Sequence, residues 1–261
     1  MNVPNKILQI KELSKNFGGL KALTNLSLEV NLGEILGIIG PNGAGKTTLF
    51  NLTTGFLKPS SGKIIFEDKD ITGLRPDSVA KNGLVRTYQS TTLFFKQTVI
   101  ENVITGFHLF STGFWQALLN TKKYKGREDE IFTRAIEILR FVGLNAVRDE
   151  LAINLPHGHQ RALGLAVALA ANPQLLLLDE PLTGMNPEET RVMMGKIRDL
   201  RDRKGITILL VEHDMKATMG LSDRIVVLSF GQKIAEGKPK EIQQNKEVIE
   251  AYLGKRKISY A

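Results

Sequence analysis

The sequence contains no cysteine and only four histidines among its 261 residues. The absence of cysteine excludes disulfide bonds, thiol catalysis and zinc sites ligated by cysteine. Long hydrophobic runs are also missing, because the longest apolar stretch, Ala162–Ala171, is about half of the ~20 residues that a membrane-spanning helix needs. The N-terminal segment MNVPNKILQIKEL lacks the apolar core of a signal peptide. We therefore expect neither a membrane span nor a secretory leader.

Positive charge is in excess, with 35 lysines and arginines, 27 acidic residues and a formal net charge of +8. Such an excess is compatible with binding to nucleic acid or to an anionic membrane surface. The basic residues are, however, spread along the whole chain, and only the terminal stretch GKRKISY is locally dense. A solvated surface is therefore the favoured interpretation, and no nucleic-acid partner is expected. The composition, 42% hydrophobic and 24% charged, is typical of a globular protein with one sizeable core and a smaller subdomain.

Short apolar segments alternate with helix-like segments along most of the chain. The segments expected to form strands are KILQI, LSLEV, EILGIIG, KIIFED, GLVRTYQ, QLLLLDE, ITILLVE and RIVVLSFG. Leu175–Leu178 and Ile206–Val211 are apolar throughout, which indicates strands buried on both faces, as in a parallel sheet. Helical patterns occur at Gly164–Ala171 and Glu188–Lys204. The alternation predicts an α/β fold that binds ligands at the carboxyl ends of its strands, and the lack of strand signals from Thr98 to Asn154 predicts an inserted helical subdomain.

A glycine-rich segment, GIIGPNGAGKTTLF, follows a predicted strand and opens a predicted helix, and residues 40–47 fit the pattern G-x-x-x-x-G-K-[ST]. Its glycines let successive backbone N–H groups point at phosphate oxygens, and the helix N-terminus adds its dipole. Lys46 is expected to bridge the β- and γ-phosphates, and Thr47 to ligate Mg²⁺. A glycine-rich turn without function is the weaker alternative. The residues expected to bind nucleotide here are Gly40, Pro41, Asn42, Gly43, Ala44, Gly45, Lys46, Thr47 and Thr48.

Two adjacent carboxylates end the apolar segment QLLLLDE. A buried acid is costly unless it meets a cation, so Asp179 is expected to hold Mg²⁺ through water. Glu180 is expected to orient or deprotonate the attacking water. A pair of acids that only caps the end of a strand is the alternative, and the phosphate loop upstream makes it less favoured.

In this combination of motifs the chain resembles the ATP-binding cassette (ABC) ATPases. GPNGAGKTT and LLLLDEP are similar to the family's Walker A and Walker B motifs. The resemblance implies Gln89 in VRTYQ as the Q-loop glutamine, which touches Mg²⁺ and senses the transporter. It also implies His213 in LLVEHD as the γ-phosphate histidine, the second catalytic residue after Glu180, and Phe17 as the aromatic that stacks on adenine. Without the other motifs, His213 would be taken for a surface histidine, and a packing aromatic remains an alternative for Phe17.

The resemblance also implies an architecture. The fold is expected to be a P-loop NTPase core with a mainly parallel sheet, an N-terminal antiparallel β subdomain and an inserted helical subdomain. The nucleotide-binding core with its β subdomain is assigned to residues 1–92 and 162–240. The helical subdomain is assigned to residues 93–161, and residues 241–261 are expected to form a short C-terminal extension.

The segment LPHGHQR stands where the family has its signature, usually LSGGQ. The signature residues implied here are Leu155, Pro156, His157, Gly158 and His159, which in the family contact the ATP of a partner cassette. Gly158 keeps the glycine that lets the backbone approach phosphate, and proline is tolerated in the first turn of a helix. His157 or His159 is a candidate replacement for the lost serine donor. Zinc binding is the weak alternative, because two histidines without a nearby carboxylate or thiol are a poor ligand set.

Three features are similar to the ATPase of branched-chain amino acid importers: KNFGGLKAL, the stretch STGFWQALLNTKKYKGREDEIFTRA, and GKPKEIQQNKEVIEAYLG. Asn186 in LTGMNPEE departs from the family's D-loop aspartate, which leaves the communication between two ATP sites undecided. The resemblance implies ATP and Mg²⁺ as cofactors and a homodimer or a heterodimer with a second cassette. It also implies two permease subunits, an extracytoplasmic binding protein as an indirect partner, and a peripheral position on the cytoplasmic side of the cell membrane.

Other functions remain open at this stage. The ATPase of a urea-type importer or of a lipopolysaccharide exporter shares much of this plan. A soluble ABC ATPase acting on the ribosome or DNA is an alternative of another class, but such proteins usually join two cassettes or carry long coiled coils. A regulator that binds ATP without hydrolysing it is disfavoured by Lys46, Asp179, Glu180 and His213.

The segment QSTTLFF places Leu93, Phe94 and Phe95 just after Gln89. We expect these apolar side chains to line a groove that receives a short helix of the permease. The alternative is that all three belong to the internal core of the helical subdomain.

Overall fold

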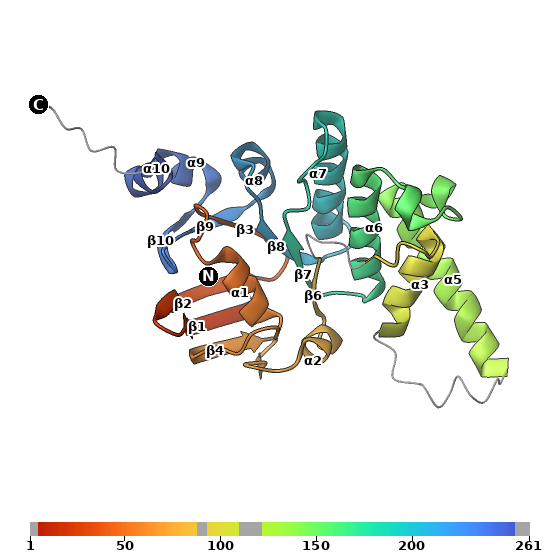
Figure 1. Ribbon diagram of the computed structural model, residues 1–261, viewed down its shortest axis with the longest axis horizontal. Helices are drawn as coiled ribbons and strands as arrows, with labels where there is room; N and C mark the ends of the chain where they lie inside the picture. Colours follow the sequence, from red (N-terminus) through yellow and green to blue (C-terminus); the bar gives the residue numbers. More distant parts are fainter. Residues whose placement is uncertain (1–4, 88–92, 110–121, 254–261) are drawn as a thin grey trace, which may run out of the picture.

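The computed structural model describes residues 5–87, 93–109 and 122–253. Its centre is a six-stranded sheet with the order β10-β9-β3-β8-β7-β6, in which β10 alone is antiparallel to its neighbour (Figure 1). The strands are β3 (Ile35–Ile39), β6 (Leu84–Arg86), β7 (Leu175–Asp179), β8 (Thr207–Val211), β9 (Arg224–Ser229) and β10 (Gln232–Gly237). Every residue of β3, β7 and β8 is buried, so the predicted parallel sheet covered on both faces is confirmed.

A second, antiparallel sheet has the order β2-β1-β4-β5. It consists of β1 (Lys6–Phe17), β2 (Leu20–Asn31), β4 (Ser61–Phe66) and β5 (Lys69–Asp70). Helix α1 (Lys46–Thr53) joins the two sheets, because its Leu49 and Phe50 pack in one apolar cluster with residues of both. The predicted β subdomain is therefore present, and it lies beside the phosphate loop (Figure 1).

Helices cover the face of the central sheet that lies opposite α1. The described helices of this part are α3 (Val99–Leu109), α5 (Lys122–Val142), α6 (His157–Ala170), α7 (Pro187–Asp202) and α8 (Met215–Leu221). Helices α3, α5 and α6 contact one another and form the helical part at one end of the molecule (Figure 1). Helix α6 crosses position 161 without a break, so it is shared by the two units that the sequence assigned to residues 93–161 and 162–240.

The C-terminal part packs on the opposite edge of the sheet. Helices α9 (Pro239–Gln244) and α10 (Lys246–Leu253) follow β10, and Ile242 and Val248 pack against Ile39 at the end of β3. The short helix α2 (Pro76–Lys81) lies next to β6. Within the ranges described, no helix has the length and apolarity required to cross a membrane.

Candidate nucleotide-binding and catalytic site

The loop between β3 and α1 has a backbone that only glycine accommodates at two points. Gly40 has φ +156°, and a Cβ atom there would lie 2.2 Å from the carbonyl oxygen of Leu228. Gly45 has φ +102°, and a Cβ atom there would lie 2.7 Å from Leu23 Cδ2. Both positions therefore need glycine for a tight curl directly before a helix N-terminus, the geometry that binds phosphate.

Lys46 is the first residue of α1, and its side chain folds back over the loop. The buried Nζ atom donates hydrogen bonds to the carbonyl oxygens of Gly40 at 2.6 Å and Pro41 at 3.1 Å. Burial lowers the pKa of the Lys46 ammonium below its ordinary value, although the nearby carboxylates of Glu180 and Asp179 act in the opposite direction. An anion in the loop would complete the charge balance of this partly desolvated cation.

An open cavity of about 560 Å³ lies over the loop. It brings together most of the residues that the sequence predicted for ATP, although their binding roles remain predictions. Its walls include Phe17, Asn42, Gly43, Ala44, Gly45, Lys46, Thr47, Thr48, Glu180 and His213. Phe17 is partly exposed, as a stacking surface must be, and the Lys15 ammonium lies 5.0 Å from its ring centroid. Phe230, which the sequence analysis did not select, lines the same cavity and is 89% exposed.

Glu180 and His213 lie next to each other in the wall of this cavity. Glu180 follows β7 directly and has φ +49°, a left-handed conformation that is uncommon outside glycine and clusters at functional sites. Its backbone N–H donates to the carbonyl oxygen of Val211 at 2.8 Å, which ties it to the end of β8. Its Oε1 atom lies 2.5 Å from Nε2 of His213. The carboxylate and the imidazole predicted to be catalytic are therefore in contact.

Glu212 is a residue of this site that the sequence analysis missed. Its side chain is buried and accepts hydrogen bonds from the backbone N–H groups of Leu182 at 2.7 Å and His213 at 3.2 Å. Burial raises the pKa of Glu212 above its usual value, and these hydrogen bonds partly offset the rise. The carboxyl group thus connects the turn after Glu180 with the segment that carries His213. The sequence signal that could have identified Glu212 is its position directly after an apolar strand.

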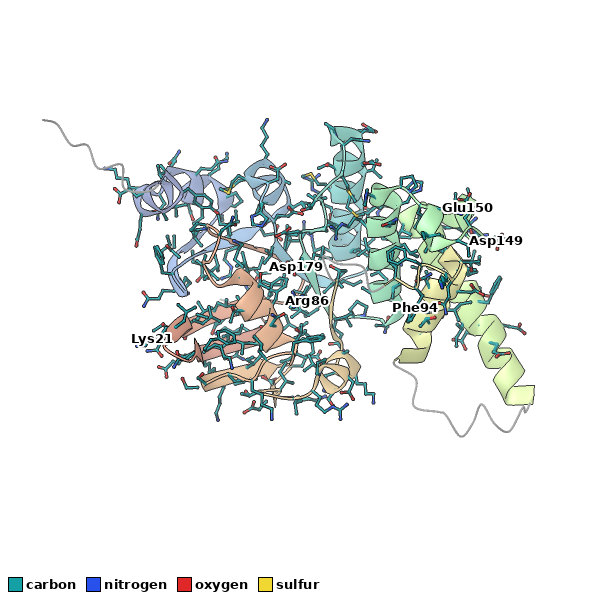
Figure 2. All side chains as sticks on the ribbon, viewed as in Figure 1. Lys21, Arg86, Phe94, Asp149, Glu150 and Asp179 are labelled. Atoms are coloured by element: carbon teal, nitrogen blue, oxygen red, sulfur yellow. The ribbon has the colours of Figure 1, made fainter. Side chains whose placement is uncertain are left out.

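Asp179 is buried and lies against Arg86 rather than in the wall of the nucleotide cavity. The two side chains meet near the middle of the molecule, with Phe94 toward the helical part (Figure 2). Arg86 Nη2 donates to Asp179 Oδ2 at 2.6 Å, and Arg86 Nη1 donates to Asn51 Oδ1 at 2.6 Å. Arg86 was not selected from the sequence, because nothing in VRTYQ indicates which residue the arginine meets.

The five signature residues are placed at the start of α6, outside the wall of the nucleotide cavity. Pro156 is the N-cap residue, with φ −56° and ψ 155°, so proline begins the helix without interrupting it. Leu155 is buried, whereas His157 and His159 are exposed. A Cβ atom at Gly158 would lie 2.6 Å from Glu189 Oε1, so within this chain the glycine makes room for a carboxylate.

Asn186, at the D-loop position, has a defined structural role. Its side chain caps α7 by accepting hydrogen bonds from the backbone N–H groups of Glu188 and Glu189, at 3.0 and 2.9 Å. Glu189 in return accepts a hydrogen bond from the backbone N–H of Asn186 at 2.9 Å, which completes a capping box. Glu189 therefore connects the D-loop position with the signature glycine.

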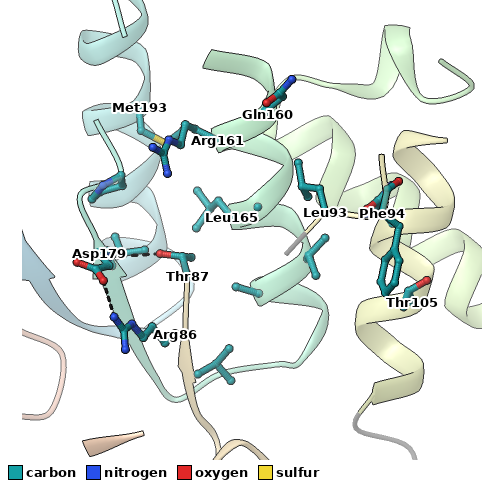
Figure 3. Close-up of a pocket in the computed structure, with 17 residues that line it drawn as sticks. Arg86, Thr87, Leu93, Phe94, Thr105, Gln160, Arg161, Leu165, Asp179 and Met193 are labelled. Carbon is teal, nitrogen blue, oxygen red and sulfur yellow. Dashed lines mark hydrogen bonds and ion pairs between the residues drawn. The ribbon is translucent and has the colours of Figure 1, made fainter. Parts of the chain in front are cut away.

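The structure describes Leu93, Phe94 and Phe95, the three residues predicted to line a groove for the permease. Gln89 lies outside the described residues. Leu93 is buried in the main apolar cluster, as the alternative interpretation had it. Phe94 is 50% exposed, and Phe95 is partly buried. Leu93 and Phe94 line a cavity of about 180 Å³ that reaches Arg86 and Asp179 (Figure 3). Of the three side chains, Phe94 is the one best placed to meet a partner.

Comparison with known proteins agrees with this geometry. Residues 23–183 match the family described as ABC transporter, and residues 232–257 match the family described as branched-chain amino acid ATP-binding cassette transporter. The high-affinity branched-chain amino acid transport ATP-binding protein LivG of Escherichia coli (strain K12) is 44% identical, over 95% of this chain and 98% of its own. The corresponding protein BraF of Pseudomonas aeruginosa is 40% identical over the same shares.

Solved structures give the same result. An ATP-binding cassette of an ABC transporter in its ADP conformation superposes with a TM-score of 0.84 at 35% identity, covering 95% of this chain and 99% of that chain. A dimeric bacterial ABC transporter cassette has a TM-score of 0.76 at 25% identity, covering 89% of this chain and 98% of that one. The phosphate loop, the Glu180–His213 contact and these matches together show that the chain belongs to the ATP-binding proteins of ABC transporters and is an ATP hydrolase of that family.

Proposed function

We propose that this chain is the ATPase subunit of a transporter that imports branched-chain amino acids. The proposed substrate is supported by the match of residues 232–257 to the branched-chain amino acid family. Relatives of that name also match over nearly the whole chain. The matched segment includes α9 and α10, which pack on the strand that leads into the phosphate loop. The chain acts from the cytoplasmic side of the membrane, where ATP is available.

The residues fit ATP and Mg²⁺. Phe17 stacks on adenine, residues 40–48 surround the phosphates, and the Lys46 ammonium contacts the β- and γ-phosphates. Mg²⁺ usually keeps several waters and binds one or two protein oxygens plus phosphate, so a closed cage of side chains is not required. The exposed Thr47 and the buried Asp179 would hold the metal in this way. Gln89, which lies outside the described residues, is proposed as a further ligand from the sequence alone. Mg²⁺ held by these residues would neutralise charge on the phosphates.

Hydrolysis follows from the positions of two side chains. Glu180 holds the attacking water and accepts its proton, because its carboxylate lies in the cavity wall directly after the metal-side aspartate. His213 contacts Glu180 through Nε2 and would donate to the γ-phosphate by turning this N–H from the carboxylate to the phosphate. Exclusion of bulk water requires a partner, because the cavity of the single chain is open.

A second cassette supplies that partner. The five signature residues close the partner's ATP site, with the backbone N–H groups at the start of α6 facing its γ-phosphate. They are Leu155, Pro156, His157, Gly158 and His159. The exposed His157 and His159 provide donors that replace the usual serine. Residues 1–92 and 162–240 act as the core, residues 93–161 as the helical subdomain that meets the permease, and residues 241–261 as the extension.

The substrate is tested with the assembled transporter, which contains this chain, its permease subunits and its binding protein in proteoliposomes. ATP hydrolysis is expected to rise several-fold when the binding protein is loaded with leucine, isoleucine or valine, because loading stabilises the closed, hydrolysing dimer. Urea added to the same vesicles is the control and should leave the basal rate unchanged. Stimulation by urea, or none by the three amino acids, would contradict the proposed substrate.

The docking surface is tested at Phe94. A photo-crosslinking phenylalanine analogue at position 94 is expected to capture a permease subunit, because the half-exposed ring borders the cavity between the sheet and the helical part. The same analogue at Ile249 is the control, since this exposed residue of α10 lies at the opposite end of the molecule (Figure 1). Capture from position 249 but not from 94, in an active complex, would place the docking surface elsewhere.

A further inference from the structure

Arg86 and Asp179 form an ion pair deep inside the protein, at the ends of neighbouring parallel strands. Arg86 is the last residue of β6, and Asp179 is the last residue of β7. Their side chains are only 5% and 6% exposed, and Nη2 and Oδ2 are 2.6 Å apart (Figure 3). Because water is nearly excluded, this contact is a far stronger constraint than a surface salt bridge.

The guanidinium of Arg86 is also held from the side of the phosphate loop. Its Nη1 donates to Asn51 Oδ1 at 2.6 Å, and its Cζ lies 5.4 Å from the ring centroid of Phe50. Both partners are on α1, the helix that begins with Lys46. The arginine therefore has a fixed position between the helix that follows the phosphate loop and the carboxylate of Asp179.

A buried carboxylate needs a positive charge at all times, whereas a metal is present only with nucleotide. Arg86 supplies that charge to Oδ2 of Asp179 continuously. Any cation that approaches Asp179 meets a carboxylate whose charge is already balanced and whose orientation is already set. The affinity of Asp179 for a metal cation is therefore lower than that of the same carboxylate without the arginine, because the approaching cation is also repelled by the guanidinium 2.6 Å from Oδ2.

We propose that Arg86 is a positioning residue that fixes Asp179 and lowers the Mg²⁺ affinity of the nucleotide site. The inference rests on the proposed role of Asp179 at the metal. Arg86 itself does not touch the metal, since both Nη atoms are engaged by Asp179 and Asn51. Its effect on the metal passes through Asp179.

The test measures metal binding to the full-length chain saturated with ADP, with Mn²⁺ as a paramagnetic probe and Mg²⁺ as competitor. Arg86→Gln is expected to bind Mn²⁺ about tenfold more tightly than the wild type, the lower end of the effect that an opposite charge has on a carboxylate. The metal should also raise the melting temperature of Arg86→Gln more than that of the wild type, because tighter binding to the folded state stabilises it more. If Arg86 is purely structural, the substitution changes the melting temperature equally with and without metal, and the metal affinity stays unchanged.

Two variants complete the design. Asn51→Ala removes the other anchor without changing any charge, so its Mn²⁺ affinity should stay within about twofold of the wild type. Arg86→Lys keeps the positive charge beside Asp179, so its Mn²⁺ affinity should also stay close to that of the wild type. If Arg86→Gln does not fold, Arg86→Met, which also removes the charge, decides the question, and an affinity equal to or below that of the wild type overturns the proposal.

Asp179→Asn separates this inference from the proposed function. If Asp179 serves the metal, Asp179→Asn weakens Mn²⁺ binding in the wild-type background and cancels the gain from Arg86→Gln. If Asp179→Asn leaves Mn²⁺ binding unchanged, the metal role of Asp179 is wrong. If it weakens binding but Arg86→Gln does not strengthen it, the role of Arg86 alone is wrong.

Discussion

Glu180→Gln is expected to bind ATP as the wild type does and to lose hydrolysis by about 10²–10⁴-fold, the usual contribution of a positioned general base. The amide keeps the size of the carboxylate and the strained backbone position but cannot accept a proton from water. It also loses the charge that faces Nε2 of His213, 2.5 Å from Glu180 Oε1. The measurement is ATP turnover by the assembled transporter, with nucleotide affinity measured in parallel.

Glu188→Gln is the matched control. Glu188 is an exposed carboxylate in the first turn of α7 that pairs with Arg191, outside the walls of the nucleotide cavity. Its replacement should leave turnover within about twofold, because exposed ion pairs on helices contribute little. Near wild-type turnover of Glu180→Gln would assign the general base to another group, and equal losses in both variants would indicate a general effect of charge.

Lys46→Ala is expected to weaken ATP binding by about 10- to 150-fold for each charged hydrogen bond that is lost, since such bonds contribute about 1.5–3 kcal/mol. The ammonium also donates to the carbonyl oxygens of Gly40 and Pro41, so its loss removes contacts that shape the empty loop. The effect should therefore appear in the dissociation constants of ATP and ADP, before any chemical step. Titration calorimetry on the full-length chain measures both.

Lys240→Ala provides the charge-matched control for Lys46→Ala. Lys240 is an exposed residue of α9 and is absent from the walls of the nucleotide cavity. This variant changes the net charge by the same amount, and nucleotide affinity should stay within about twofold of the wild type. Unchanged ATP affinity of Lys46→Ala would show that the backbone N–H groups of the loop bind the phosphates without the lysine.

Much of the fold was predictable because its signals are local. The strands β3, β7 and β8 are short apolar runs between helical patterns, and all three lie in the central sheet. Strands β5 and β10 were not predicted, since Lys69–Asp70 is only two residues long and Gln232–Gly237 is largely polar. Both are edge strands, where neither burial nor periodicity leaves a strong pattern. Helix α6 begins earlier than its apolar pattern, because Pro156 and the polar residues that follow start it.

The residue types of the site were likewise evident from the sequence, because a phosphate loop is a continuous segment whose glycines and lysine have fixed spacing. Which side chains touch was decided by the tertiary structure. Arg86 and Asp179 are 93 residues apart, the Glu180–His213 contact joins the ends of two strands, and Glu189 of α7 occupies the space beside Gly158 of α6. Periodicity in a sequence records which face of a strand is buried, whereas the partner of a polar side chain depends on strand order and register. The sequence by itself therefore determined a phosphate-binding α/β protein with two candidate acids, and only the packing of β6, β7 and β8 against α1 decided that one acid is paired with a buried arginine while the other faces a histidine.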